Sequence, residues 1–257
     1  TQEYGKYSIR GKSDLSAEAE IKTSGLDKDY ATDWSYGISE TLTLLIPNFH
    51  GGASAGPLPE KSKTFELLKQ IQGDKQARQT ILQMPTYWGD QPSTAGPVYA
   101  GAVIIFLFVM GLFLLKGRLK WWLLAVTLLS IMLSWGRNFY WLTNLFLDYF
   151  PGYNKFRSVS MTLIMAEFAI PLLGILTVNE ILKGSYSKEK IWKTALYSLY
   201  IAGGICAVFI LFGGTFFNFS AAIDQQYLEH GAKEFVNALR SDRMMLLRRD
   251  AFRSLCF

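Results

Sequence analysis

Four long runs of apolar residues constrain this chain more than any other feature of its sequence. They consist mostly of Leu, Ile, Val, Phe, Ala and Gly and occupy residues 97–115, 121–135, 160–182 and 194–217. A helix rises about 1.5 Å per residue, so roughly 20 apolar residues cross the hydrocarbon core of a bilayer. Backbone polar groups in lipid must pair internally, which favours helices in runs this rich in Leu and Phe. The sequence therefore predicts an all-α polytopic membrane protein with four transmembrane helices.

Positive charge is concentrated in two short loops between the apolar runs. Residues 116–120 contain three cations and no acid, and residues 183–193 contain four lysines and one glutamate. The loop over residues 136–159 is longer and contains only three cations. Short cationic loops remain in the cytoplasm, so residues 1–96, 136–159 and 218–250 are predicted to face outward. The basic residues beyond position 230 favour the opposite orientation, although acids dilute them.

The first 96 residues are polar and nearly balanced in charge, with ten basic and twelve acidic side chains. The pattern is typical of an extracytoplasmic loop region with short helices. Asp33 is placed to cap a helix that runs to Leu45 with apolar residues at helical spacing. Its apolar side suits either the membrane surface or packing against other loops. Two further short helices are expected at residues 62–72 and 75–84.

The end of the chain combines a segment of mixed charge with a short apolar segment. Residues 218–250 are predicted to form an extracytoplasmic amphipathic helix. Residues 251–257 are apolar enough to begin a fifth span, so the chain is expected to be an internal piece of a longer protein. The two cysteines give no disulfide pattern, and the two histidines lie too far apart to indicate a zinc site. The net charge of +5 is spread over several loops, which argues against a nucleic-acid partner.

One carboxylate lies inside an apolar run. An ionised carboxylate at the depth of Glu167 costs about 2.5–3.5 kcal/mol even on lenient scales, so this side chain is expected to face the bundle interior or a wet cavity. Two interpretations remain open: a carboxylate on a substrate or proton pathway, and a neutral or paired glutamic acid that bonds to a neighbouring helix. Pro171 leaves the Glu167 carbonyl without its usual helical donor, which favours a kink there.

Three cations flank the outward loop between the second and third runs. Arg137 ends the second run, and Lys155 and Arg157 precede the third. They are therefore predicted to meet at the outer headgroup level, where a lipid-linked phosphate or pyrophosphate would present its charge. A guanidinium binds phosphate through two parallel hydrogen bonds. The alternative is simple headgroup anchoring, because the aromatic residues of the same loop suit the membrane interface.

Several short strings in the outward segments are distinctive. They are Ala31-Thr32-Asp33-Trp34-Ser35-Tyr36-Gly37, Leu45-Ile46-Pro47-Asn48-Phe49, Tyr87-Trp88-Gly89-Asp90-Gln91-Pro92, Gly96-Pro97-Val98-Tyr99 and Pro151-Gly152-Tyr153-Asn154-Lys155-Phe156-Arg157. With these strings the chain resembles, over nearly all of its length, the bacterial YfhO-type membrane proteins in the form common among Bacteroidota. The resemblance implies a multi-pass protein of the bacterial inner membrane and a glycosyltransferase of the GT-C type. Such an enzyme transfers a sugar from a polyprenyl-phosphate donor to a glycan or envelope polymer on the outer face.

The resemblance also suggests roles for particular residues. In that superfamily the catalytic carboxylate usually lies in the first outer loop, which the resemblance places outside this chain. Asp33 and Asp90 lie in the family strings on the outward side and are the candidates here. Tyr87 and Trp88 offer aromatic faces for a sugar ring, or anchor the interface, and the three cations would hold the departing lipid phosphate. Two other functions fit the same features: a transporter or flippase of lipid-linked sugars with Glu167 on its pathway, and a non-catalytic envelope scaffold.

Overall fold

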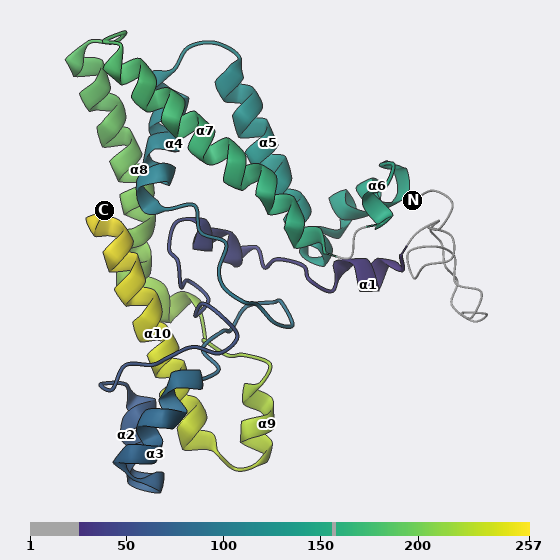
Figure 1. The fold of residues 1–257 in the computed structure, drawn as a ribbon, viewed down its shortest axis with the longest axis vertical. Coiled ribbons are helices and arrows are strands. Elements are labelled where there is room, and N and C mark those ends of the chain that lie inside the picture. The colour runs from purple at the N-terminus through teal and green to yellow at the C-terminus, as the bar shows by residue number, and fades with distance from the viewer. Residues whose placement is uncertain (1–25, 156–157) are drawn as a thin grey trace.

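The computed structural model describes residues 26–155 and 158–257, and this part of the chain is all-α (Figure 1). Within it, the only strand-like pairing is an isolated antiparallel bridge between Gly56 and Met84. The helices form two layers: a layer of apolar helices, and a polar layer of short helices, loops and one long charged helix (Figure 1). The all-α fold class predicted from the sequence is confirmed.

The helices of the apolar layer follow the four apolar runs of the sequence. They are α4 (Ala102–Leu114), α5 (Leu119–Ser134), α7 (Leu163–Leu182) and α8 (Lys188–Phe216). α4 packs against both α7 and α8, and α5 packs against α7 (Figure 1). The contact between α4 and α7 depends on Gly111, where a Cβ would lie 2.3 Å from Thr177 Oγ1.

Part of the predicted four-span arrangement is present. α7 and α8 are long and apolar enough to cross a membrane, and a third span exists if α5 and the segment Gly136–Tyr149 are taken together across a bend of 114°. α4 is apolar but has only 13 residues. It begins at Ala102 rather than near residue 97, because Gly101 has a φ of +107° and its N–H donates to Leu44 O. The described chain thus has two or three helices of membrane length, and four spans stay a prediction.

The outer surface of the apolar layer is also apolar. Leu182, Phe168 and Leu211 are 81%, 69% and 66% exposed, and many other large apolar side chains are exposed on the same helices. Soluble monomers rarely expose continuous apolar patches larger than several hundred Å². Lipid would cover these faces, so their exposure supports a membrane location.

The polar layer lies at one end of the apolar layer. Its elements, where η marks a 3-10 helix, are α1 (Lys28–Thr32), η2 (Ser39–Leu44), α2 (Lys63–Gln72), α3 (Asp74–Thr80), η3 (Ile81–Gln83), α9 (Asp224–Glu229) and α10 (Lys233–Cys256). The chain between α5 and α7 forms η4 (Gly136–Phe139), α6 (Tyr140–Tyr149), η5 (Tyr153–Lys155) and η6 (Val159–Thr162). Ser62 caps α2 by accepting a hydrogen bond from Phe65 N–H, and this helix confirms the one predicted at residues 62–72.

Asp33 does not begin a helix, which corrects the expectation from the sequence. Asp27 is the cap of α1, because its carboxylate accepts two backbone N–H groups of the first turn. α1 ends just before Asp33. The helix expected from Asp33 to Leu45 is replaced by the shorter η2. The reason is that Tyr36 N–H donates to Ser134 O at the end of α5, which holds the intervening chain out of a helix.

The charged segment near the end of the chain forms two helices rather than one. α9 is short, and a turn with Gly231 at a φ of +76° separates it from α10. α10 runs without a break through Cys256. The structure therefore has no helix boundary at residue 250, where the sequence predicted the charged helix to end and a fifth span to begin. It packs against α8 in the apolar layer and against α2 in the polar layer (Figure 1).

Three buried polar side chains of α10 hold the loops of the polar layer. Asp242 accepts hydrogen bonds of 2.9 and 2.8 Å from the first two N–H groups of α2. Arg243 lies 2.9 Å from Asp224 and donates to Pro85 O across 2.7 Å. Ser254 donates to the carbonyl that follows η2 across 2.9 Å. α10 therefore connects α2, the loop after η3 and η2.

Candidate functional site

A cluster of polar side chains lies where the polar layer meets the end of α5. Three segments supply it: η2, the loop after η3, and η4. Its members, which we call the polar site, are Glu40, Tyr87, Asp90, Arg137 and Asn138. Tyr87 lies 47 residues after Glu40, and Arg137 lies 47 residues after Asp90. Only the fold therefore brings these side chains together.

Contacts with the end of α5 fix the segment that carries η2. Trp135 Nε1 donates to Thr41 Oγ1 across 2.8 Å. Arg137 N–H donates to Ser35 Oγ across 2.9 Å. Gly136 lies between them with a φ of +49°, and a Cβ there would lie only 2.1 Å from Ser35 Oγ. The close approach therefore requires a glycine at this position.

Glu40 is the buried centre of the polar site, with 2% of its surface exposed. Its carboxylate accepts from Tyr87 Oη (2.5 Å), Gly37 N–H (2.6 Å) and Asp90 N–H (3.4 Å). An ionised carboxylate only accepts hydrogen bonds, so three donors favour the charged form. Burial acts in the opposite direction and raises the pKa of Glu40 above its usual value, although the hydrogen bonds from Tyr87 and Gly37 limit the effect.

Two glycines allow the backbone to approach this carboxylate. A Cβ at Gly89 would lie 2.2 Å from Glu40 Oε1 and 2.4 Å from Tyr87 Oη. A Cβ at Gly37 would lie 2.9 Å from Asp90 Oδ2 and 3.0 Å from Glu40 Oε2. Because Asp90 Oδ2 and Glu40 Oε2 both lie within 3.0 Å of the Cβ position at Gly37, the two carboxylates are close neighbours.

Asp90 is the exposed carboxylate of the polar site. Its Oδ2 accepts from Asn138 Nδ2 across 3.1 Å, and the same amide donates to Tyr36 O across 3.0 Å, which fixes its orientation. Arg137 Nη2 donates to Asp90 O across 3.2 Å, and this arginine is also exposed. The polar site therefore combines an exposed, oriented carboxylate and an exposed guanidinium with the buried carboxylate of Glu40.

The two tyrosines near Glu40 are neutral phenols at physiological pH. Burial raises the pKa of Tyr87 far above its usual value, and the charge of Glu40 adds to this effect. Its oxygen also accepts from Gln91 N–H across 2.9 Å. Burial raises the pKa of Tyr36 to about 12, and its hydroxyl lies 2.5 Å from Thr43 Oγ1. Both hydroxyls thus act as hydrogen-bonding groups that order the loops.

Trp88 is not available to a sugar, which corrects the expectation from the sequence. Only 7% of its surface is exposed. Its ring centroid lies 4.0 Å from that of His50 and 4.9 Å from that of Phe219. Phe219 comes from the segment after α8, far away in sequence, so local sequence could not reveal this cover. Burial also lowers the pKa of His50 to about 4, and this imidazole is therefore neutral at pH 7.

The structure brings together three of the site residues expected from the sequence: Tyr87, Asp90 and Arg137. Tyr87 is half-buried, so part of its ring remains accessible. Lys155 ends η5, in the segment after α6. Arg157 lies outside the described residues. The predicted meeting of the three cations therefore stays a prediction.

Glu167 does not face the interior of the apolar layer. It is exposed on α7 in the described chain. The buried face of this helix is occupied by Ala166, Ile170 and Leu173, which pack against α4 and α5. Glu167 lies beside that face rather than on it, so the described helices do not place it in the bundle interior, and a position facing a wet cavity stays a prediction.

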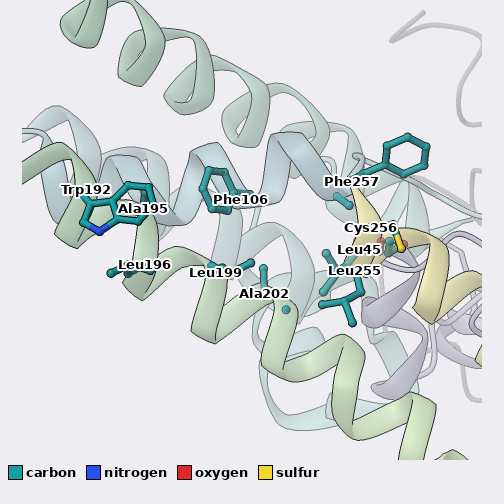
Figure 2. Close-up of a pocket in the computed structure, with 13 residues that line it drawn as sticks. Leu45, Phe106, Trp192, Ala195, Leu196, Leu199, Ala202, Leu255, Cys256 and Phe257 are labelled. Carbon is teal, nitrogen blue, oxygen red and sulfur yellow. Dashed lines mark hydrogen bonds between the residues drawn. The ribbon is translucent and has the colours of Figure 1, made fainter. Parts of the chain in front are cut away.

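An apolar groove lies between α4, α8 and the end of α10, as Figure 2 shows. Its volume is about 330 Å³. Trp192 lies at one end of the groove, Phe106 lies along it, and Leu45 and Ala202 lie toward the other end (Figure 2). Leu45 directly follows η2, so one end of the groove adjoins the element that carries Glu40. Such a groove suits a hydrocarbon chain.

No protein-family model, curated protein or solved structure matches this chain. The polar site and the groove therefore carry the functional argument. Within the described residues, no group of three or more His, Cys, Asp and Glu side chains is arranged to hold a metal ion. The chemistry that these residues offer is proton transfer at Asp90 and anion binding at Arg137.

Glu40 was not singled out in the sequence, although it organises the polar site. It lies in a short segment whose polar residues alternate with Leu, and a glutamate there is typical of a solvated helix face. One local signal was Gly37, three residues before Glu40, where a Cβ would lie 3.0 Å from Glu40 Oε2.

Proposed function

We propose that the chain is part of a membrane glycosyltransferase that transfers a sugar from a polyprenyl-phosphate donor to an envelope acceptor outside the cytoplasm. One observation carries the proposal: just beyond the C-terminal end of α5, the exposed Arg137 guanidinium donates to the backbone carbonyl of Asp90, whose exposed carboxylate Asn138 orients. The resemblance to YfhO-type proteins is consistent with this placement, because Tyr87 and Asp90 belong to one of the strings that carry it.

The reaction requires a base and a stabilised leaving group. Asp90 accepts the proton of the acceptor hydroxyl. At the same time the oxygen of that hydroxyl bonds to the anomeric carbon of the donor sugar. The bond between that carbon and the phosphate oxygen breaks, and polyprenyl phosphate leaves. Arg137 binds the phosphate and offsets the negative charge that develops on it. The products are the glycosylated acceptor and polyprenyl phosphate.

The remaining residues of the polar site support this pair. Glu40 holds the peptide N–H of Asp90 and the hydroxyl of Tyr87, so it is a positioning residue. Asn138 orients the Asp90 carboxylate. The apolar groove beside α8 would receive part of the polyprenyl chain, because its walls are mostly apolar (Figure 2).

The test is sugar transfer by the protein purified from its native membrane, with a radiolabelled polyprenyl-phosphate sugar and native envelope polymer. Asp90→Asn keeps the shape of the side chain but removes the base, so turnover is expected to fall at least about 100-fold. Arg137→Gln is expected to raise the KM for the lipid donor about 10- to 100-fold, and Arg137→Lys to restore part of that loss.

Asp29→Asn is the matched control, because Asp29 is an exposed carboxylate in the first turn of α1. It is expected to retain full turnover. Asp33→Asn decides between the two carboxylates that the sequence suggested. Full transfer activity in a folded Asp90→Asn protein, or loss of activity only in Asp33→Asn, would contradict the proposal.

A second function is favoured by one observation. The bend of 114° between α5 and Gly136–Tyr149 interrupts an apolar segment next to the polar site. Broken helices of this kind form substrate sites in transporters, usually in pairs. A transporter or flippase would move a lipid-linked sugar across liposomes without consuming it. Transfer of label to the acceptor in detergent, where no membrane separates two compartments, distinguishes the enzyme from the transporter and from a scaffold.

A further inference from the structure

The end of the apolar layer opposite the polar layer is basic. The α4–α5 loop and the α7–α8 loop both lie at this end (Figure 1). Together with the first turn of α5 and the first two turns of α8, these loops contain Lys116, Arg118, Lys120, Lys183, Lys188, Lys190 and Lys193. We call this surface the basic end. Its function is independent of the proposed sugar transfer.

Part of this positive charge is satisfied within the chain. Lys183 and Lys193 form ion pairs of 3.0 and 2.7 Å with glutamates of the same region. Lys120 Nζ donates to a carbonyl near the end of α4 across 2.6 Å. Lys116 and Arg118 are exposed, and neither forms an ion pair within the described residues. Their charge is therefore available to a partner.

The cations do not stabilise the helices that they precede. A helix N-terminus carries a partial positive charge, so acids are favoured there and cations are disfavoured. α5 starts with Arg118 as its N-cap and Lys120 in its first turn, and this turn has no acid. The first turn of α8 contains Lys188 and Lys190 beside a single acid, Glu189. The arrangement is better explained by an anion that comes from outside the chain.

A shallow hollow adjoins Arg118. Trp121, Trp122 and Ala125 form the rest of its lining, and its volume is about 330 Å³. The two indoles are 59% and 66% exposed. Lys120 Nζ lies 5.2 Å from the centroid of the Trp121 ring. The hollow thus combines an exposed guanidinium with two exposed aromatic rings at the end of an apolar helix.

We infer that the basic end binds the headgroup phosphate of an anionic phospholipid, with Arg118 as its main contact and Lys116 beside it. Three observations favour a lipid over a soluble anion. The hollow is open, its lining below the guanidinium is apolar, and its indoles lie at a helix end where the membrane interface would be. Trp favours that interface, and juxtamembrane cations attract anionic lipids.

The test is native mass spectrometry of the full chain, released from micelles that contain equal amounts of phosphatidylglycerol and phosphatidylcholine with identical acyl chains. The protein is expected to retain phosphatidylglycerol in preference. Arg118→Gln is expected to lower this preference about fivefold, and the additional Lys116→Gln to lower it about fivefold again. Lys75→Gln is the matched control: it removes an exposed cation from α3 in the polar layer and is expected to leave the preference unchanged.

Two further measurements keep the result interpretable. The thermal unfolding of Arg118→Gln in a neutral detergent without phospholipid is expected to match that of the unaltered chain, so a lost preference reports lipid binding and not misfolding. Trp121→Phe with Trp122→Phe tests the aromatic part of the hollow and is expected to weaken retention of both lipids. Equal retention of the two lipids by the unaltered chain overturns the inference. So do an equal effect of Lys75→Gln, and displacement of the lipid by millimolar glycerol phosphate, which would indicate a site for a free phosphate.

Discussion

Tyr87 donates a hydrogen bond of 2.5 Å to the buried carboxylate of Glu40, which lies 47 residues earlier in the chain. The same phenolic oxygen accepts from Gln91 N–H across 2.9 Å. One hydroxyl thereby joins η2 to both ends of the turn that carries Asp90. The orientation of the exposed carboxylate consequently depends on a side chain that need not itself touch a substrate.

Removing this hydroxyl should destabilise the fold. Tyr87→Phe leaves the buried carboxylate of Glu40 with one donor fewer, and a hydrogen bond to a charged group contributes about 1.5–3 kcal/mol. The measurement is the free energy of unfolding in a neutral detergent. Tyr149→Phe is the matched control, because Tyr149 is 80% exposed, and it is expected to change stability by less than about 0.5 kcal/mol. Equal effects of the two substitutions would show that the bond to Glu40 contributes nothing.

The polar site should tolerate no side chain at Gly89. A Cβ there would lie 2.2 Å from Glu40 Oε1, whereas a Cβ at Gly96, in the same loop region, would meet nothing within 4 Å. Gly89→Ala is therefore expected to cost about 1–3 kcal/mol, and Gly96→Ala close to nothing. Thermal unfolding of the two variants, side by side, measures the difference. A Gly89→Ala protein as stable as Gly96→Ala would mean that the loop relaxes freely around Glu40.

The burial of His50 should make stability depend on pH. Its pKa falls from 6.5 to about 4 on folding, so between these values the unfolded chain binds a proton that the folded chain does not. The stability contributed by neutral His50 is therefore complete above pH 6.5 and is lost as the pH falls toward 4, by up to roughly 3 kcal/mol. His50→Gln should flatten this part of the curve when unfolding is measured from pH 4.5 to pH 7. His230→Gln, at an exposed position, should leave the curve parallel to that of the unaltered chain.

Arg243 and Asp224 form a buried ion pair, and removing one or the other side chain should lower the stability of the fold by different amounts. The two side chains are 0% and 1% exposed and lie 2.9 Å apart, and Arg240 also lies 3.2 Å from Asp224. Asp224→Asn removes the ion-pair partner of the buried Arg243, which is expected to cost about 3–5 kcal/mol. Arg243→Met leaves Asp224 with Arg240 and should cost less. A double-mutant cycle of Asp224 with Arg243 measures the interaction energy between the two side chains. If the two losses of stability simply add, the ion pair contributes nothing and the prediction is wrong.

The helices of the apolar layer could be predicted from sequence because lipid selects for composition and length alone. The start of α4 could not, since it depends on the N–H of Gly101 reaching Leu44 O. Glu167 also shows this contrast between what composition predicts and what tertiary contacts determine. Its place in an apolar run was evident, whereas the face it occupies depends on which residues of α7 pack against α4 and α5.

The polar site was predicted in part. Asp90 and Tyr87 were recognisable because they lie in a distinctive string, and Arg137 because it ends an apolar run. Glu40 and the burial of Trp88 were not, because key partners, Asp90 for Glu40 and Phe219 for Trp88, come from distant segments whose pairing only the fold determines.

The continuity of α10 links the membrane to the polar site. Asp242 and Ser254 bind α2 and the carbonyl after η2 at points about 18 Å apart on one rigid helix. A change in the tilt of α10 against α8 therefore displaces both attachments at once. The tilt of a membrane-spanning helix responds to the thickness of the bilayer. Because α10 packs against α8, which is long and apolar enough to span, we expect the stability of the loops around Glu40 to vary with acyl-chain length. Hydrogen exchange of those loops in short-chain and long-chain bilayers measures that dependence, and identical exchange in both would exclude it.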